Sequence, residues 1–306
     1  LPEGFDVKKA SEWENAEVNG NILTVTDTKS DVTYTYDLGN GEISEYEFTL
    51  RPVKIKEIEI NEENFPDEKF RSYVNENFDT TDDDILTADE IVAAKEMDVS
   101  EHEISDLTGV EYFIKLERLG CKKNKLTSLD LSKNIMLVSL NCNDNQLKTL
   151  DLSKNTQLES LYCQDNQLKT LDLSKNTKLE YLYCTRNKLT SLDLSKNTAL
   201  ERLQCDDNQL TSLDVSNNTL LQGLSCDGNE LVSLDISGCT VLQWLYCTDN
   251  QLTSLDISNN IMLGLRELET VNNVYEIVLD GNTFDLSALP EGFDVKKASE
   301  WENAEV

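Results

Sequence analysis

The chain has few basic residues, one histidine and no long apolar run, and each shortage argues against a class of function. Among its 306 residues, 58 are acidic and 27 are basic, which gives a net charge of −31. This negative field repels nucleic acids and anionic membranes, because both are bound through clustered Lys and Arg. No run of about 18 apolar residues is present, so no segment is expected to cross a membrane. The composition favours solubility and cationic partners or divalent metal ions.

Signals of catalysis are missing as well. His102 is the only histidine, so a Ser-His-Asp triad could be built only around it. Its place on an expected turn favours an ordinary solvated side chain. No glycine-rich phosphate loop follows an expected strand. The abundant Asp and Glu make some carboxylate pair inevitable, so such a pair does not indicate glycoside hydrolysis. We therefore expect a protein that is not an enzyme.

The beginning of the chain returns near its end. The segment LPEGFDVKKASEWENAEV occupies residues 1–18 and recurs unchanged at 289–306, an offset of 288 residues. This recurrence predicts a longer parent protein of near-identical tandem units, of which the chain is one unit and the start of the next. The alternative is an artificial duplication. The opening residues lack the basic and apolar stretches of a signal peptide, so none is expected here.

Cysteine recurs every 21 residues in the middle of the chain, within the frame Leu-x-x-Leu-x-Cys-x-x-Asn-x-Leu-x-x-Leu-Asp-hydrophobic-Ser-x-x. A fixed period of this length is typical of a solenoid, in which each repeat packs on its neighbours. We expect a strand centred on Leu-x-Cys, with Leu and Cys inward and extended or 3₁₀ structure on the opposite, convex side. The Asn three residues after each Cys is expected to bond backbone groups of the adjacent turn. The repeated cysteines are Cys121, Cys142, Cys163, Cys184, Cys205, Cys226 and Cys247.

We expect these cysteines to be reduced. Stacked parallel strands place successive Cys side chains about 5 Å apart and pointing the same way, which rarely meets disulfide geometry. They are therefore interpreted as small buried hydrophobes. A structural zinc site would need convergent ligands at short spacing, which are absent. Cys239 lies outside this series, at a position where other repeats carry Asn, and is interpreted as an ordinary substitution in a turn.

The segments around the repeats have other periods. Residues 19–50 alternate apolar and polar side chains, as in Val32, Tyr34 and Tyr36, which predicts strands. Residues 61–100 change to helical spacing, and a second helix is expected from about Ala88. We divide the chain into a β-rich module (1–57), a helical segment (58–96), the repeats (97–270) and the start of a second β-rich module (271–306).

The repeated frame resembles the bacterial leucine-rich repeat of the internalin family, over roughly residues 58–270. The resemblance implies a leucine-rich-repeat solenoid with parallel β on the concave face. It also implies an α-helical, EF-hand-like N-terminal cap at 61–96 and a β module after the repeats. Members are generally cell-wall adhesins of Gram-positive bacteria that bind host proteins or glycoproteins. An extracellular or cell-wall-attached location is therefore implied.

The acidic loop between the expected helices partly fits a calcium-binding EF-hand loop. Asp79, Thr81, Asp83 and Glu90 occupy positions one, three, five and twelve of that pattern. Thr81 is a weaker ligand than a carboxylate, and Asp84 stands where glycine normally permits the turn. Glu90 also has capping-box spacing from Thr87. Calcium binding stays open, but we expect no cofactor and a metal-free cap that shields the first repeat.

The concave face is the better candidate site. Its outward positions vary between repeats, while the convex half barely changes. Tyr, Trp and Arg are enriched at binding hot spots, although aromatics also favour strands and pack across neighbours. The predicted partner-binding residues are Arg118, Tyr162, Tyr181, Tyr183, Arg186, Arg202, Trp244 and Tyr246.

We therefore predict an adhesin-like binding protein that recognises a protein or glycoprotein of a host or neighbouring cell. The alternative is a structural spacer or stalk built of tandem units. We expect a monomer, with end-to-end contacts between β modules through their free edges.

Overall fold

The computed structural model describes residues 55–263 and the short strand β16 (Leu268–Glu269). Before residue 55 it describes the backbone of five strands, and the second copy of the LPEGFD segment lies outside the described residues. The chain divides into two compact units, Leu1–Lys56 and Glu57–Val306.

The first unit is antiparallel β. Strands β1 (Ala10–Glu14), β4 (Val32–Asp37) and β5 (Ile43–Phe48) form one sheet in the order β1-β4-β5. A hairpin joins β2 (Ala16–Asn19) to β3 (Ile22–Val25). The apolar alternation after Asp31 therefore forms a strand, as the sequence predicts, and pairs Tyr34 with Tyr46 on β5.

The second unit opens with two helices. Helix α1 (Glu68–Phe78) begins at Asp67, whose carboxylate accepts hydrogen bonds from the backbone of Lys69 and Phe70. Strand β6 (Ile58–Glu59) pairs with β7 (Ile85–Leu86), and helix α2 (Ala88–Ala93) follows. The other carboxylate oxygen of Asp67 accepts from the backbone N–H and the hydroxyl of Ser105, at 2.8 and 2.9 Å. The helical segment is thus bonded to the first repeat.

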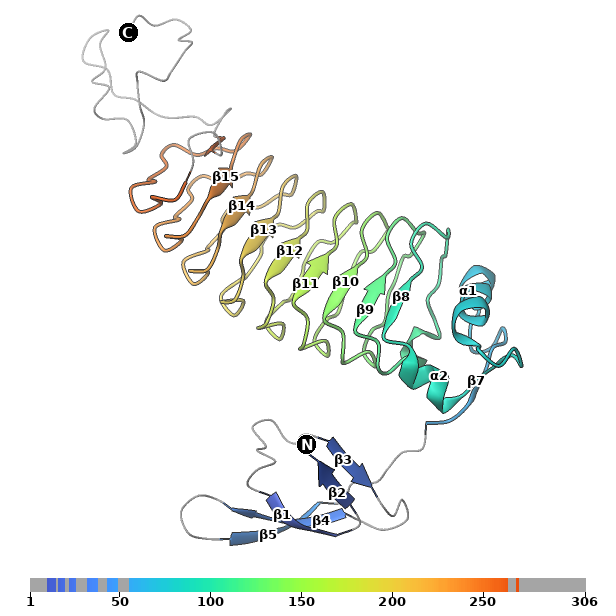
Figure 1. Ribbon diagram of the computed structural model, residues 1–306. Coiled ribbons are helices and arrows are strands. Elements are labelled where there is room, and N and C mark those ends of the chain that lie inside the picture. Colours follow the sequence, from blue (N-terminus) through green and yellow to red (C-terminus); the bar gives the residue numbers. More distant parts are fainter. Residues whose placement is uncertain are drawn as a thin grey trace, which may run out of the picture. The chain divides into compact units, whose positions relative to one another are not determined.

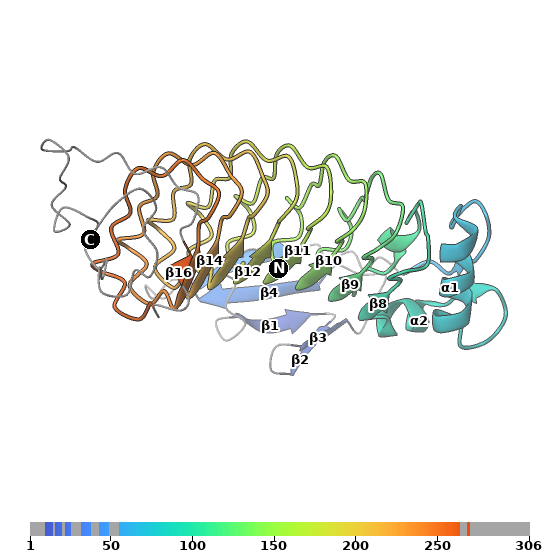
Figure 2. The same ribbon diagram turned by 90° about the horizontal axis from the view of Figure 1, so that it is seen from above.

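The repeats form a solenoid whose strands lie side by side along one face (Figures 1 and 2). Between residues 118 and 246 each strand pairs in parallel with the residues 21 positions away, so Leu140 lies between Leu119 and Leu161. At the start of the repeats Met97 pairs with Leu119, an offset of 22. A central inward Leu and a period of 21 thus fix the register of the sheet. The strands are β8 (Glu96–Asp98), β9 (Arg118–Gly120), β10 (Ser139–Asn141), β11 (Ser160–Tyr162), β12 (Tyr181–Tyr183), β13 (Arg202–Gln204), β14 (Gly223–Ser225) and β15 (Trp244–Tyr246).

The side of the solenoid opposite the strands consists of tight turns. The N–H of Asn155 donates to the carbonyl of Leu152 at 3.0 Å, and the N–H of Leu158 donates to the carbonyl of Asn155 at 3.1 Å. These three-residue closures are of the 3₁₀ type, which confirms the expectation for this half of the repeat. Across the described turns this side carries no α-helix.

Leucine and cysteine fill the interior, as the frame predicts. Leu161, Cys163 and Leu168 are fully buried, and their counterparts in the other repeats match them. All eight cysteines, including Cys239, are free thiols with no exposed area. Burial raises the pKa of the Cys184 thiol to about 12 and that of Cys239 to about 11. The expectation of reduced core thiols is confirmed.

Burial and raised pKa should together make the thiols inert in the folded protein. We expect iodoacetamide at about pH 8 to label no cysteine of the native chain, because the thiolate is the reactive form. After denaturation in urea, mass spectrometry should find all eight labelled. Rapid labelling of the native chain would contradict the burial of the cysteines. A mass lower by two hydrogens for each cysteine pair would show disulfide bonds and contradict their reduced state.

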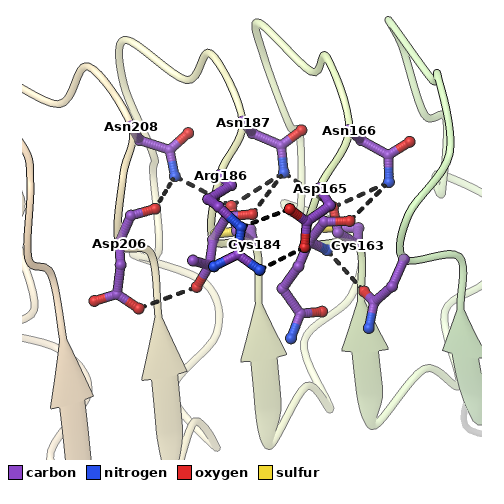
Figure 3. A network of polar contacts seen from close by, with 11 residues as sticks. Cys163, Asp165, Asn166, Cys184, Arg186, Asn187, Asp206 and Asn208 are labelled. Atoms are coloured by element: carbon purple, nitrogen blue, oxygen red, sulfur yellow. Dashed lines mark hydrogen bonds and ion pairs between the residues drawn. The ribbon is translucent and has the colours of Figure 1, made fainter.

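Two rows of asparagine tie each turn to its neighbours. In the first row, Asn187 donates to the carbonyls of Cys163 and Cys184 at 2.9 and 3.1 Å (Figure 3). Its Oδ1 accepts from the N–H of Leu168 at 3.0 Å. This confirms the expected role of the Asn that follows each Cys. In the second row, Asn176 donates to the carbonyls of Leu152 and Asn155, at 3.1 and 2.9 Å. Its Oδ1 accepts no hydrogen bond from the protein.

Candidate binding surface

Strand geometry decides which side chains reach the outside of the sheet. In each strand the central residue, Met97 in β8 and Leu in the others, points into the core, so the residues before and after it point outward. We call these outward positions of β8–β15 the sheet face. The predicted aromatics on it are half-buried: Tyr162, Tyr181, Tyr183, Trp244 and Tyr246. They are therefore partly covered by neighbours and partly open to solvent.

Two tyrosines form a stack across neighbouring strands. Tyr162 on β11 and Tyr183 on β12 are paired in the sheet register, and their ring centroids lie 5.0 Å apart with an interplanar angle of 8°. Such aromatic pairs contribute about 0.5–1.5 kcal/mol beyond burial. The stack is therefore a fixed feature of the sheet face and not two independent side chains.

Tyr181 lies on the same strand as Tyr183, on the other side of the inward Leu182. Its hydroxyl donates to Oε2 of Glu201 at 3.2 Å. The negative charge of Glu201 and this hydrogen bond raise the pKa of Tyr181. The hydroxyl is thus held towards the row of glutamates that precedes the strands.

A second aromatic pair lies on β15. The rings of Trp244 and Tyr246 are 5.6 Å apart with an interplanar angle of 29°. The indole leans over β14, where a Cβ on Gly223 would come within 2.0 Å of it. Gly223 is therefore required for close approach of the indole. Tyr246 lies three strand spacings from Tyr183, which is about 14 Å.

The three predicted arginines have different surroundings. Arg186 follows β12 in a left-handed turn with φ 52°, and its Nε and Nη2 bind both carboxylate oxygens of Asp165 at 2.5 and 2.6 Å (Figure 3). This hydrogen-bonded ion pair raises the pKa of Arg186. Arg118 binds Glu96 on the neighbouring β8. Arg202 is exposed on β13.

The predicted set is thus divided along the sheet face. Tyr162, Tyr181 and Tyr183 come together over β11 and β12, with the Arg186–Asp165 pair at the end of these strands. Trp244 and Tyr246 form a separate group on β15, and Arg118 lies at the opposite end beside β8.

One polar network was not predicted. Asp206, just after β13, accepts from the hydroxyl of Thr185 at 3.0 Å, from the N–H of Asp227 at 3.0 Å and from the hydroxyl of Ser225. Asp227 accepts in turn from the N–H of Thr248 at 2.6 Å. A sequence signal existed, because Asp stands directly after Cys in two successive repeats. The network fixes carboxylates at the end of the strands between the two aromatic groups.

The candidate calcium loop is closed by its own hydrogen bonds. Asp79 accepts from the backbone of Asp82 at 2.7 Å and of Asp84 at 2.8 Å, and from the hydroxyl of Thr81 at 3.3 Å. Asp84, at the position usual for glycine, has a φ of 59°. Asp83 accepts from the N–H of Ile85.

Both carboxylate oxygens of Glu90 accept hydrogen bonds from threonines. One of its oxygens accepts from the N–H and hydroxyl of Thr80, both at 2.6 Å, and the other from the N–H and hydroxyl of Thr87, both at 2.8 Å. The capping box with Thr87 is therefore confirmed. Within the part of the chain that the structure describes, no group of three or more His, Cys, Asp or Glu side chains is placed to hold a metal ion.

The described helices are short. None of them has the length and apolar character needed to cross a membrane. The sole histidine, His102, is exposed on its turn, as predicted, where Nδ1 lies 2.7 Å from the carbonyl oxygen of Ser100.

Comparison with known proteins points to one family. Residues 156–197 match the model of the family "Leucine Rich repeats (2 copies)". Internalin J of Listeria monocytogenes is 36% identical over 119 residues, which cover 38% of this chain and 13% of that protein. The chain therefore spans about an eighth of the length of this curated relative.

Two solved structures share the fold. An internalin C2 of Listeria monocytogenes aligns with a TM-score of 0.63 and 21% identity, over 68% of this chain and 95% of that one. A leucine-rich-repeat protein of Leptospira interrogans aligns with a TM-score of 0.50 and 25% identity, over 61% of this chain and 58% of that one. With its 21-residue turns, parallel sheet and cysteine ladder, this chain is an internalin-like leucine-rich-repeat protein.

Proposed function

We propose that the chain is a non-enzymatic binding module, cell-surface or secreted, that recognises a protein or glycoprotein through its sheet face. The observation that carries this proposal is the presence of five partly exposed aromatic side chains on the sheet face, three on β11 and β12 and two on β15. Aromatic residues are enriched at binding hot spots because they bury a large area with little loss of conformational entropy.

The rest of the molecule supports this role. A solenoid held by buried leucines and two asparagine rows is a rigid frame, so its outward side chains are ordered before a partner arrives. Preorganisation of this kind lowers the entropic cost of binding. The proposal includes no cofactor, since both oxygens of Glu90 are already occupied by Thr80 and Thr87.

Location belongs to the same proposal. The relative in Listeria monocytogenes carries the name internalin, and we place this chain outside the cell by that similarity. Attachment to a Gram-positive cell wall, and the capping role of α1 and α2 at the first repeat, are further parts of the proposal.

The test is a binding screen with two substitutions on the sheet face. The unaltered chain is first screened against an array of extracellular proteins and glycoproteins to find a partner. Tyr183→Ala and Trp244→Ala should then each raise the dissociation constant for that partner by about 30-fold, the effect of a hot spot. Leu220→Ala is the matched control, because it removes an apolar side chain that is 53% exposed away from the sheet face. Circular dichroism should show the same fold for all three variants.

The spacer alternative makes the opposite prediction. If the repeats serve only to hold other modules apart, Tyr183→Ala and Trp244→Ala should leave every interaction of the chain at the level of Leu220→Ala. Such a result, with folded variants, would refute recognition through the sheet face.

A further inference from the structure

The two ends of the sheet face differ in charge balance. Beside β8 and β9 three exposed glutamates each have a basic partner on the neighbouring turn. Glu96 binds Arg118, Glu117 binds Lys95 at 2.9 Å, and Glu101 binds Lys123 at 2.9 Å. This end is therefore close to neutral.

From β11 to β15 acidic side chains outnumber basic ones. The five strands with their flanking residues (159–165, 180–186, 201–207, 222–228 and 243–249) carry eight carboxylates and two guanidinium groups. Glu159, Glu180 and Glu201 precede the strands, and Asp165, Asp206 and Asp227 follow them. Carboxylates thus precede β11, β12 and β13 and follow β11, β13 and β14.

The glutamate row is unfavourable for the isolated protein. Glu159, Glu180 and Glu201 occupy equivalent positions on adjacent turns, where backbone spacing is about 5 Å. Like charges at this spacing repel each other. Of the two guanidinium groups, that of Arg186 is already bound at both ends of its fork by Asp165. This leaves Arg202 as the other positive charge on these five strands.

Tyrosine faces and carboxylates together suit one kind of ligand. A Lys ammonium or an Arg guanidinium is attracted to aromatic rings through the ring quadrupole and to carboxylates through charge. A neutral glycan would stack on the rings and donate hydroxyl hydrogen bonds, but it would leave the charge of the carboxylates uncompensated. An anionic ligand would be repelled.

We propose that β11–β15 bind a basic segment of a partner protein, with its Lys or Arg side chains against the tyrosines and between the flanking carboxylates. This inference rests on the proposed function and specifies that the partner is positively charged where it contacts the sheet face. The occupant is a protein surface rich in Lys and Arg, and the charge-paired β8–β9 end lies outside the contact.

The test uses decaarginine as the probe and isothermal titration calorimetry as the readout, with the full chain. The triple variant Glu159→Gln/Glu180→Gln/Glu201→Gln should bind decaarginine at least about ten-fold more weakly than the unaltered chain. Tyr183→Ala should also lower the affinity for decaarginine. The matched control is Asp130→Asn/Asp151→Asn/Asp172→Asn, which removes the same charge from turns outside the sheet face. Each of these aspartates accepts from a serine N–H two residues on at 2.9 Å, a role that asparagine keeps. The control should change binding by less than about two-fold.

Either of two results with decaarginine would overturn the proposal. Equal weakening by both triple variants would show attraction by the net charge of −31 alone, and absence of decaarginine binding to the unaltered chain would show no site. The partner found in the binding screen distinguishes this proposal from the broader one, which is recognition of any protein or glycoprotein through the sheet face. A partner lost on Tyr183→Ala but kept by the glutamine triple variant refutes the basic segment and leaves recognition by the sheet face intact.

Discussion

Asn187→Cys is expected to destabilise the solenoid by about 3–5 kcal/mol. The side chain of Asn187 is buried and connects three backbone groups, two carbonyls and the N–H of Leu168. Cysteine is a weak donor that cannot replace these bonds. The N–H of Leu168 is then left without an acceptor, at about 1–3 kcal/mol, and two donated bonds are lost at about 1 kcal/mol each, although the carbonyls of Cys163 and Cys184 still accept from Asn166 and Asn208. The free energy of unfolding in urea, followed by circular dichroism, measures the loss.

The chain itself supplies the control. Cys239 stands where the other repeats place an asparagine of the second row, and its sulfur lies 3.6 Å from the carbonyl of Val215 and 3.8 Å from that of Asn218. The same substitution in that row, Asn176→Cys, should therefore cost about 1–2 kcal/mol. An equal loss from Asn176→Cys and Asn187→Cys would contradict the difference between the two rows.

The difference has a physical cause. An asparagine of the first row uses its donor and its acceptor, whereas Oδ1 of Asn176 is buried without a partner in the protein. A buried acceptor left unpaired offsets part of what the two donated bonds contribute. The second row is therefore the one in which cysteine can replace asparagine.

The period of 21 made most of the solenoid predictable from the sequence. The inward Leu and Cys, the parallel register and the hydrogen bonds of the first asparagine row all follow from a repeat that packs on copies of itself. The second asparagine row was visible as a repeated residue, but its burial was not, since turns are usually exposed. The interpretation of Cys239 as an ordinary turn substitution missed that this position is fully buried.

The candidate site was less predictable, because it depends on side-chain directions. Alternation in the strand placed Tyr162 and Tyr183 outward, and the register implies that they are neighbours. The reach of Arg186 to Asp165 and the covering of Gly223 by Trp244 depend on rotamers that the repeat does not specify. The Asp206 network likewise depends on three different turns.

The helical segment should respond to acid through Glu90. Burial of this side chain, which is 7% exposed, opposes its ionisation, but four hydrogen bonds from Thr80 and Thr87 outweigh that effect and lower the pKa of Glu90 to about 2. The ordinary value is 4.5. A carboxylate with a lowered pKa in the folded state adds stability above its unfolded pKa, and this contribution is lost as the pH falls through the folded value.

Glu90→Gln should therefore cost about 3 kcal/mol near pH 7 and almost nothing near pH 2. The amide cannot accept at both ends, so one threonine pair loses its acceptor. Unfolding in urea at the two pH values measures the difference, and the NMR titration of the Glu90 carboxyl should give a midpoint near 2. Glu76→Gln, an exposed change on α1, is the matched control. A titration midpoint near 4.5 would mean that the threonine hydrogen bonds do not form with this carboxylate in solution. It would contradict the claim that Glu90 stabilises the junction between the acidic loop and α2.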